Sequence, residues 1–297
     1  MAKFNLSTDS TVDFKKSYLE ANGVDYIICK RILNGVTLAE IYDSDEEYAA
    51  FYESLKNGDL PSTTQLNPNE LEEYFASLVE KYPTGDIVHI GISSTLSQTH
   101  SNVEAAAVVI NEKLGGARKL YTIDSLSVSA GLAQQVDELI RLRDSGVSAE
   151  EAVKYIDELK HYQGVWLAVD DLKHLKRGGR ISGMKTLIGT ILNIKPILHI
   201  NAKGKGAIES RQRGTNRAID YIVSKIEQRA DCKYKHIPVY ILHTVAPDKF
   251  AQLKDVLAKK FPDIVLKEIN LGPVVGTHVG TGAVGLSFVG KKRVDVD

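Results

Sequence analysis

The chain has 297 residues, of which 43% are hydrophobic and 25% charged, and its formal net charge is −1. This length and composition indicate a globular protein, with a core large enough for more than one domain. Acidic and basic residues are interspersed, so the sequence gives no bulk electrostatic reason to bind nucleic acid or an anionic membrane.

The first 14 residues contain no apolar region typical of a signal peptide, and no run approaches the roughly 18 apolar residues that a membrane helix needs. We therefore expect a cytoplasmic protein without an integral membrane segment. The only cysteines, Cys29 and Cys232, lie far apart, and the eight histidines form no HxH or HExxH pair. We expect neither a metal site nor a cofactor.

Short apolar runs alternate with helical patterns along most of the chain. Strands are predicted at residues 3–7, 26–30, 86–92, 119–123, 164–169, 195–201, 238–244, 264–269 and 283–289. Three helices have readable starts: Ser44 can cap a helix that ends near Gly58, Asn67 stands before a proline, and Ser148 forms a capping box with Glu151. This alternation predicts an α/β protein with parallel pairing at least over the first half.

The character of the sequence changes around residues 163–183, where a basic run is broken by glycines. We place a domain boundary here, between an N-terminal domain of residues 1–163 and a smaller C-terminal domain of residues 164–297. In the second domain we expect a strand, a turn at residues 201–206, a helix from about Arg213, and then further strands and a helix. The cleft between the domains is the natural place for a ligand.

Hydroxyl-rich runs follow three predicted strands, at residues 7–11, 93–95 and 124–127. At the carboxyl ends of parallel strands such groups meet helix N-termini and can hold an anion, although a helix cap is the more common role of any one run. His278 lies among Gly276, Gly280 and Gly282, where a ligand can closely approach the backbone. Together these runs indicate a carboxylate-binding site.

Two other interpretations stay open. Residues 91–95 resemble the GxSxG elbow of α/β-hydrolases, so Ser93 or Ser94 with His278 could form a serine esterase, although the second glycine is missing and no acid stands out as partner. Arginines in basic segments such as these usually lie on a solvated surface. Arg213 could instead hold a phosphate at a helix start, and Arg180, in a Gly-Gly-Arg turn, could face a partner.

The order and spacing of seven short runs closely resemble the DegV family, the fatty-acid-binding proteins that serve bacterial fatty acid kinase. The runs cover nearly the whole chain, at residues 8–11, 63–65, 92–97, 123–125, 175–182, 194–198 and 277–280. The resemblance implies two domains, one a three-layer α/β/α domain with a parallel sheet and the other a two-layer α/β domain with a mixed sheet. It also implies one long-chain fatty acid buried between them.

In the family pattern, the carboxylate ligands correspond to Thr63, Ser94 and His278, with Ser93, Thr64 and Gly280 beside them. The resemblance further implies that the chain is a monomeric carrier and not itself an enzyme. A separate kinase subunit would phosphorylate the bound acid with ATP to give an acyl phosphate for phospholipid synthesis. A stand-alone lipid sensor is the remaining alternative. The sequence departs from the family pattern at residues that flank the proposed ligands, namely Leu66, Asn67, Gln98, His100 and Thr281.

Overall fold

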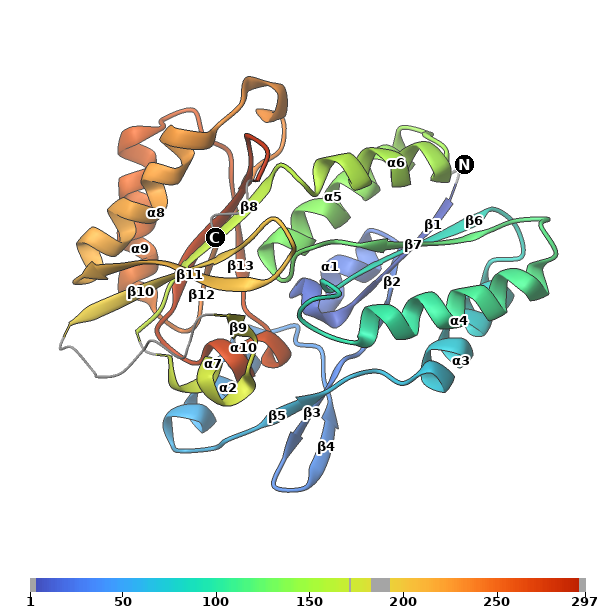
Figure 1. The fold of residues 1–297 in the computed structure, drawn as a ribbon, viewed down its shortest axis with the longest axis horizontal. Helices are drawn as coiled ribbons and strands as arrows, with labels where there is room; N and C mark the ends of the chain where they lie inside the picture. Colours follow the sequence, from blue (N-terminus) through green and yellow to red (C-terminus); the bar gives the residue numbers. More distant parts are fainter. Residues whose placement is uncertain (1–3, 171, 183–192, 294–297) are drawn as a thin grey trace.

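The computed structural model of the protein describes residues 4–170, 172–182 and 193–293. Its strands form a four-stranded, a seven-stranded and a three-stranded sheet (Figure 1). All nine predicted strands are present, with ends that differ by a few residues from those expected. The predicted α/β class is therefore confirmed.

The four-stranded sheet is entirely parallel, in the order β2-β1-β6-β7, which confirms the pairing expected for the first half. Its strands are β1 (Phe4–Asp9), β2 (Val24–Ile27), β6 (Asp86–Gly91) and β7 (Leu120–Asp124). On one face Ile87 and Leu120 pack with α3 (Pro68–Lys81) and α4 (Thr99–Leu114). The other face packs against α1 (Lys16–Ala21), α5 (Ala130–Asp144) and α6 (Ala149–Leu159), which gives the predicted three layers.

The seven-stranded sheet is mixed, in the order β13-β12-β14-β8-β10-β11-β9. Its strands are β8 (Gln163–Ala168), β9 (Ile181–Ser182), β10 (Ile194–Ile200), β11 (Gly206–Arg213), β12 (Val239–His243), β13 (Leu266–Asn270) and β14 (Val284–Val289). Helices α8 (Thr215–Arg229) and α9 (Pro247–Lys260) pack on one face, so this part has the two layers expected. The opposite face turns toward α5, which contacts β8, β12 and β14 as well as β1.

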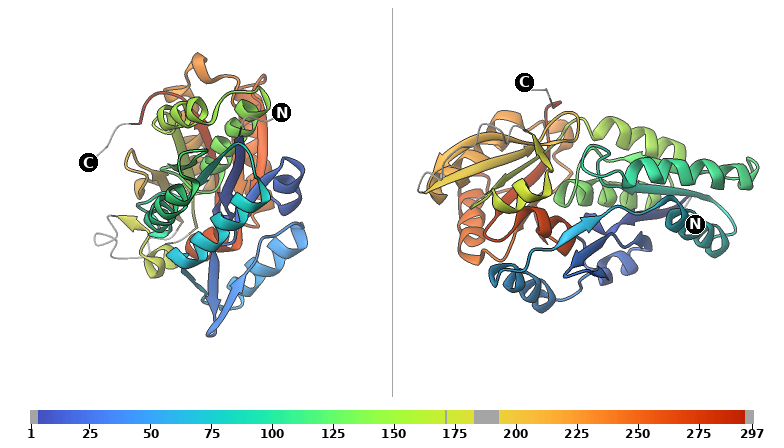
Figure 2. Two further views of the ribbon diagram at one scale, coloured as in Figure 1. Left: turned by 90° about the vertical axis from the view of Figure 1, so that its right-hand side faces the viewer. Right: turned by 60° about the horizontal axis from the view of Figure 1, so that its bottom comes forward.

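The three-stranded sheet was not predicted. It joins β3 (Lys30–Leu33), β4 (Val36–Ala39) and β5 (Ser62–Thr64) in antiparallel pairs, and the β3–β4 hairpin projects from the fold (Figures 1 and 2). Asn34 and Gly35 both have positive φ in its turn, and Asn-Gly between two short strands is a strong hairpin signal. Helix α2 (Asp45–Lys56) lies between β4 and β5 in the chain.

The predicted starts of three helices agree with the structure, but the predicted start of α8 does not. Ser44, Asn67 and Ser148 each cap their helix in a complete capping box. Arg213, by contrast, is the last residue of β11 and not part of a helix start, because Gly214 separates it from α8. The mostly polar strand β11 has no apolar alternation, and its pairing with β10 and β9 makes it a strand.

Short helices complete the chain: η1 (Ser10–Val12), α7 (Lys173–Gly178), η3 (Cys232–Tyr234) and α10 (Pro273–Val279). Residue 163, where we place the domain boundary, is the first residue of β8. The boundary itself stays a prediction. Among the described residues, no helix is long and apolar enough to cross a membrane.

Candidate functional site

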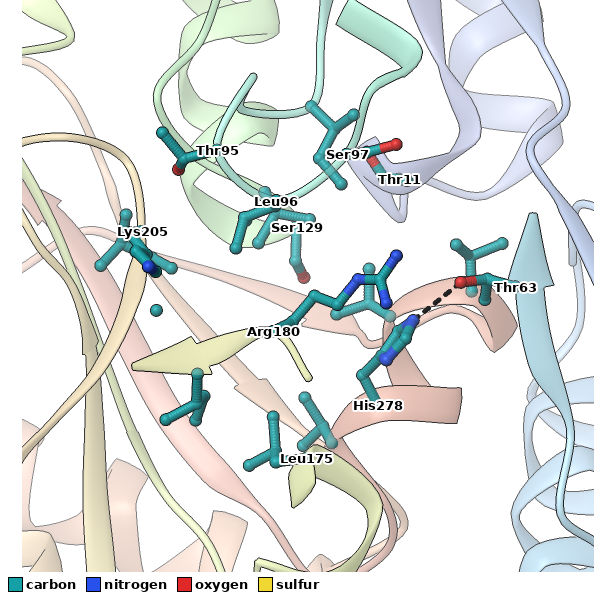
Figure 3. A pocket seen from close by; sticks show the side chains of 18 of the residues that line it. Thr11, Thr63, Thr95, Leu96, Ser97, Ser129, Leu175, Arg180, Lys205 and His278 are labelled. Atoms are coloured by element: carbon teal, nitrogen blue, oxygen red, sulfur yellow. Dashed lines mark hydrogen bonds between the residues drawn. The ribbon is translucent and has the colours of Figure 1, made fainter. Parts of the chain in front are cut away.

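A cavity of about 670 Å³ lies between the inner face of the seven-stranded sheet and the loops that follow β6 and β7 (Figure 3). Its lining also comes from β5, α7 and α10, so segments far apart in the sequence meet around one space. This volume is within the range of roughly 300–1,000 Å³ that is typical of small-molecule sites.

The inside of the cavity is apolar and its edge is polar. Buried wall residues are Val165 and Leu167 on β8, Leu198 on β10, Leu242 on β12, and Leu271 before α10. The exposed lining residues, which we call the polar rim, are Thr64, Gln65, Ser94, Thr95, Gln98, Gly179, Arg180 and Lys205. No aspartate or glutamate is among the described lining residues. The cavity can therefore bury an apolar ligand while its edge meets a polar or anionic group.

Thr63 and His278 meet in the cavity wall, as the sequence predicts for a shared site. Thr63 Oγ1 and His278 Nε2 are 2.8 Å apart, the one hydrogen bond drawn in Figure 3. Thr63 is fixed in β5 by pairing with Arg31 of β3. His278 is near the end of α10, a helix that runs from Pro273 to Val279 and is capped by Gly280, whose φ is +78°. Thr63 and His278 are 215 positions apart in the chain, so only tertiary packing brings them together.

His278 is held neutral by its surroundings. Burial and, to a lesser extent, the charges of Arg180 and Arg177 lower its pKa to about 4. The ring lies against Gly178, where an added Cβ would be 2.1 Å from His278 Nδ1. With the proton on Nε2, the imidazole donates to Thr63 Oγ1, and the threonine hydroxyl hydrogen is free to donate to an anion. The pair therefore offers hydrogen bonds without a formal charge.

The two serines of the predicted site have different surroundings. Ser94 lies in the polar rim, and its backbone N–H donates to Asp124 Oδ1 at 3.1 Å. Ser93 is fully buried and is not among the described lining residues; its hydroxyl is 3.1 Å from Thr95 Oγ1. Ser94 thus shares the cavity with Thr63 and His278, whereas Ser93 holds the loop in shape.

Of the other predicted site residues, some line the cavity and others do not. Thr64 and Arg180 line the cavity, and Arg180 Nη1 donates to the Gly178 carbonyl at 2.5 Å. Gly280 is buried at the end of α10 and is not among the described lining residues, because its Cα packs on His174. Arg213 lies away from the cavity, at the end of β11.

Sequence reasoning missed several lining residues. Lys205 belongs to the predicted turn at residues 201–206, but nothing in a turn pattern places it in a cavity. Cys29 follows β2, and Ser129 starts α5 with a φ of +54°. Of these three, only Ser129 had a signal, since it lies two residues after the hydroxyl-rich run at residues 124–127. Over residues 4–170, 172–182 and 193–293, no three His, Cys, Asp or Glu side chains gather as a metal site.

Comparison with known proteins agrees with the geometry. The model of the DegV family of uncharacterised proteins matches residues 3–291. The chain belongs to the DegV family. The protein DegV of Bacillus subtilis is 30% identical over 287 residues, which cover 95% of this chain and 97% of that protein. A DegV domain-containing protein of Staphylococcus aureus is 31% identical over 294 residues, covering 98% of this chain and all of that protein (100%).

Solved DegV structures share the whole fold. The crystal structure of DegV from Bacillus subtilis, described as a fatty acid binding protein, has a TM-score of 0.82 at 28% identity and covers 98% of this chain and 100% of that one. A DegV family protein from Thermus thermophilus, described by its fatty acid binding, has a TM-score of 0.84 at 26% identity with the same coverage. These likenesses confirm the predicted family and the mixed α/β architecture.

Proposed function

We propose that the protein binds one long-chain fatty acid in its cavity and presents the carboxylate to a separate ATP-dependent kinase. The observation that carries the proposal is the apolar cavity with the neutral Thr63–His278 pair in its wall. The fatty acid binding of DegV relatives from Bacillus subtilis and Thermus thermophilus supports it. In this proposal the protein acts as a monomer in the cytoplasm, as a carrier and not as the catalyst.

The apolar wall supplies most of the binding free energy. Burying an acyl chain of about 15 methylene groups at ~0.8 kcal/mol each gives roughly 12 kcal/mol before the costs of ordering the chain and the protein. Buried leucines and valines of β8, β10 and β12 offer the surface for this contact. Tight binding therefore needs few polar contacts.

The carboxylate needs hydrogen bonds when it leaves water, because an unpaired charge is expensive to bury. Thr63 and Ser94 can donate such bonds, with His278 donating to the Thr63 oxygen, and Thr64 lies beside them in the rim. Because none of these side chains is a cation at neutral pH, the carboxylate is not locked in a buried ion pair. Its oxygens stay available to a phosphoryl donor at the exposed rim.

The serine esterase alternative requires a histidine that contacts the nucleophile and an acid that orients the histidine. Here His278 Nε2 is paired with Thr63, and Ser93 Oγ is paired with Thr95. The charged and titratable groups that act on the pKa of His278 are Arg180, Arg177 and His174, none of them an acid. No observation favours the esterase over the carrier.

Native and denaturing mass spectrometry of the purified protein tests the proposal directly. We expect one fatty acid per chain to remain bound in the native spectrum and to be released on denaturation. A protein that is empty and also refuses added fatty acids contradicts the proposal. Adding a kinase subunit and ATP to the loaded protein then separates a carrier from a stand-alone sensor, since only a carrier yields an acyl phosphate.

His278→Ala tests the site within the same assay. We expect retention of the fatty acid to fall by at least tenfold, while the free energy of unfolding changes by about 1 kcal/mol or less. The matched control is His236→Ala, a half-exposed histidine whose Nε2 lies 3.7 Å from Glu138. Equal retention by the two variants would remove His278 from the site.

Arg180 and Arg213 are proposed contacts of the kinase partner. Arg180 belongs to the rim, and Arg213 is exposed at the end of β11. Substitution of either by glutamine is expected to slow kinase-dependent phosphorylation with fatty acid binding largely intact. Loss of fatty acid binding would instead assign the residue to the pocket or to the fold.

A further inference from the structure

The cavity carries more positive charge than a single carboxylate can balance. Its described lining residues include two permanent cations, Arg180 and Lys205, and no carboxylate side chain. Both cations are exposed at the rim, so water can solvate them when nothing is bound. One bound carboxylate would balance only one of these two charges. The remaining positive charge could bind a second anionic group.

Among the described residues, Lys205 has no acidic partner of the kind that other lysines of the same sheet region have. Lys195 and Lys249 both pair with Asp170, at 2.7 and 2.6 Å, and Lys225 pairs with Glu209. Across the described residues, no carboxylate lies within ion-pair distance of Lys205 Nζ, and its ammonium makes no hydrogen bond to a protein atom. A lysine in a cavity wall without a protein partner is available to a ligand.

The backbone of Lys205 is fixed, although its side chain is not. The backbone N–H groups of Lys203 and Lys205 both donate to Asn201 Oδ1 at 3.0 Å, and Asn201 N–H donates back to the Lys205 carbonyl. Arg293 Nη1 in turn donates to the Asn201 carbonyl at 3.0 Å. The turn is thus tied to the body of the protein and carries its lysine in a defined place.

The same turn reaches across to the hydroxyl-rich loop after β6. An added Cβ on Gly204 would lie 2.3 Å from Ser93 Oγ and 2.9 Å from Leu126 Cα, so only a glycine fits there. This contact brings Lys205 to the side of the cavity that the Ser93–Thr95 loop forms, and Figure 3 shows Lys205 and Thr95 on one side, with Thr63 and His278 on the other. Lys205 therefore belongs to a part of the cavity that the Thr63–His278 pair does not occupy.

We propose that Lys205 forms a second anion-binding subsite in the cavity, for an anionic group that the ligand carries in addition to the carboxyl group held by the Thr63–His278 side. The inference rests on the proposed function, because it takes the first carboxylate as bound by Thr63, Ser94 and His278. Two sources share this chemistry: the phosphoryl group of an acyl phosphate, and the far carboxylate of a long-chain dicarboxylic acid. A plain monocarboxylic acid leaves the subsite to water.

The test compares three ligands of equal chain length on delipidated protein by calorimetry: stearic acid, octadecanedioic acid, and a non-hydrolysable phosphonate analogue of stearoyl phosphate. Lys205→Gln is expected to weaken binding of one of the two doubly functional ligands by about tenfold or more, the effect of one charge-assisted hydrogen bond, with stearic acid unchanged. Selective loss of the phosphonate identifies the phosphoryl source, and selective loss of the dicarboxylic acid identifies the other.

Two further variants keep the test specific. Lys203→Gln removes the same charge from the same turn, at an exposed residue outside the described cavity lining, and should change none of the affinities. Lys205→Arg keeps the charge and should restore binding. The proposal is overturned if Lys205→Gln weakens all three ligands equally or behaves like Lys203→Gln. Binding of stearic acid to the wild-type protein is measured in the same series, so failure of the proposed function is seen separately.

Discussion

Two polar regions lie between the parallel and the mixed sheet, and they differ in how their atoms are paired. Under α5, the glutamine cluster of Gln134, Gln135, Gln163 and Ser287 is buried. Gln134 Nε2 donates to the carbonyls of Pro238 and Ser287, its Oε1 accepts from Ser287 and Gln163, and Gln163 Oε1 accepts from Gln135. Gln135 Oε1 is the one amide oxygen of the cluster without a hydrogen-bond partner among the described residues. The other groups pair with one another and join α5 to the mixed sheet.

The cavity wall is the opposite case. Thr63 and His278 pair with each other, but His278 Nδ1 has no hydrogen-bond partner within the described part of the chain, and the rim hydroxyl groups face solvent. A polar cluster whose atoms are mostly paired fixes a fold, whereas polar groups at a cavity edge that face solvent are left for a ligand. The comparison predicts that substitutions under α5 change stability, and that substitutions in the cavity wall change binding.

The largest expected effect is on stability, from Gln134→Ala. The substitution removes one hydrogen bond each from the Ser287 hydroxyl, the Gln163 amide and the Pro238 carbonyl, so we expect the free energy of unfolding to fall by about 3 kcal/mol. Urea denaturation of the delipidated protein measures it. Gln228→Ala, on the exposed face of α8, is the control and should change it by roughly 0.5 kcal/mol or less. Equal effects would contradict the assignment of the cluster.

Asp13→Asn tests a buried carboxyl group behind the cavity wall. Neither carboxyl oxygen of Asp13 makes a hydrogen bond of ordinary geometry with the described residues. Burial raises its pKa to about 8, although the Ser129 hydroxyl and the Gly272 N–H act in the opposite direction. Between about pH 4 and pH 8 the folded protein keeps this proton and the unfolded chain has lost it.

The contribution of Asp13 to the free energy of unfolding therefore falls as the pH rises from about 4 to about 8. The asparagine variant removes the titration and should be more stable than the wild type at pH 8, by on the order of 2 kcal/mol, with little difference at pH 4. Thermal unfolding followed across this range measures it, with exposed Asp263→Asn as control. Parallel pH profiles of wild type and Asp13→Asn would show that Asp13 is not protonated in the folded protein.

Thr63→Val tests a side chain of the cavity wall. The expected change, in the free energy of ligand binding, is smaller than the two stability changes above. Valine keeps the size of the side chain and its fit to β5, but it removes the hydroxyl that meets His278. We expect fatty acid affinity to fall about tenfold, which corresponds to ~1.4 kcal/mol. Thr37→Val makes the same change at an exposed position of β4 in the same sheet. If the two variants bind fatty acid equally well, the Thr63 hydroxyl is not a ligand.

The smallest expected effect is in the titration of His278. Its folded pKa of about 4 is lower than the ordinary value of 6.5, so its stabilising contribution is complete above about pH 6.5 and is lost as the pH falls toward 4. Imidazole resonances of the ligand-free protein should show His278 neutral at pH 6. Arg180→Gln should shift its pKa upward, because a neighbouring positive charge is removed. A His278 that titrates near 6.5 would contradict its burial.

Local patterns predicted much of the fold. Capping boxes at Ser44, Asn67 and Ser148 depend on residues three positions apart, and the four parallel strands of the first sheet read as short apolar runs. The same reasoning missed β11, whose residues are mostly polar, and it placed Arg213 at the start of a helix. In β11 the hydrogen bonds to β10 determine the structure, and they join residues that no local pattern relates.

The sequence by itself determined the family, the α/β class and the candidate ligands Thr63, Ser94 and His278, because order, spacing and periodicity are properties of the chain. Only the tertiary structure decided that Thr63 meets His278 across 215 residues, that Ser93 is buried while Ser94 faces the cavity, and that Lys205 stands in its wall. Burial, pairing and charge balance depend on which distant segments pack together, and folding alone brings those segments into contact.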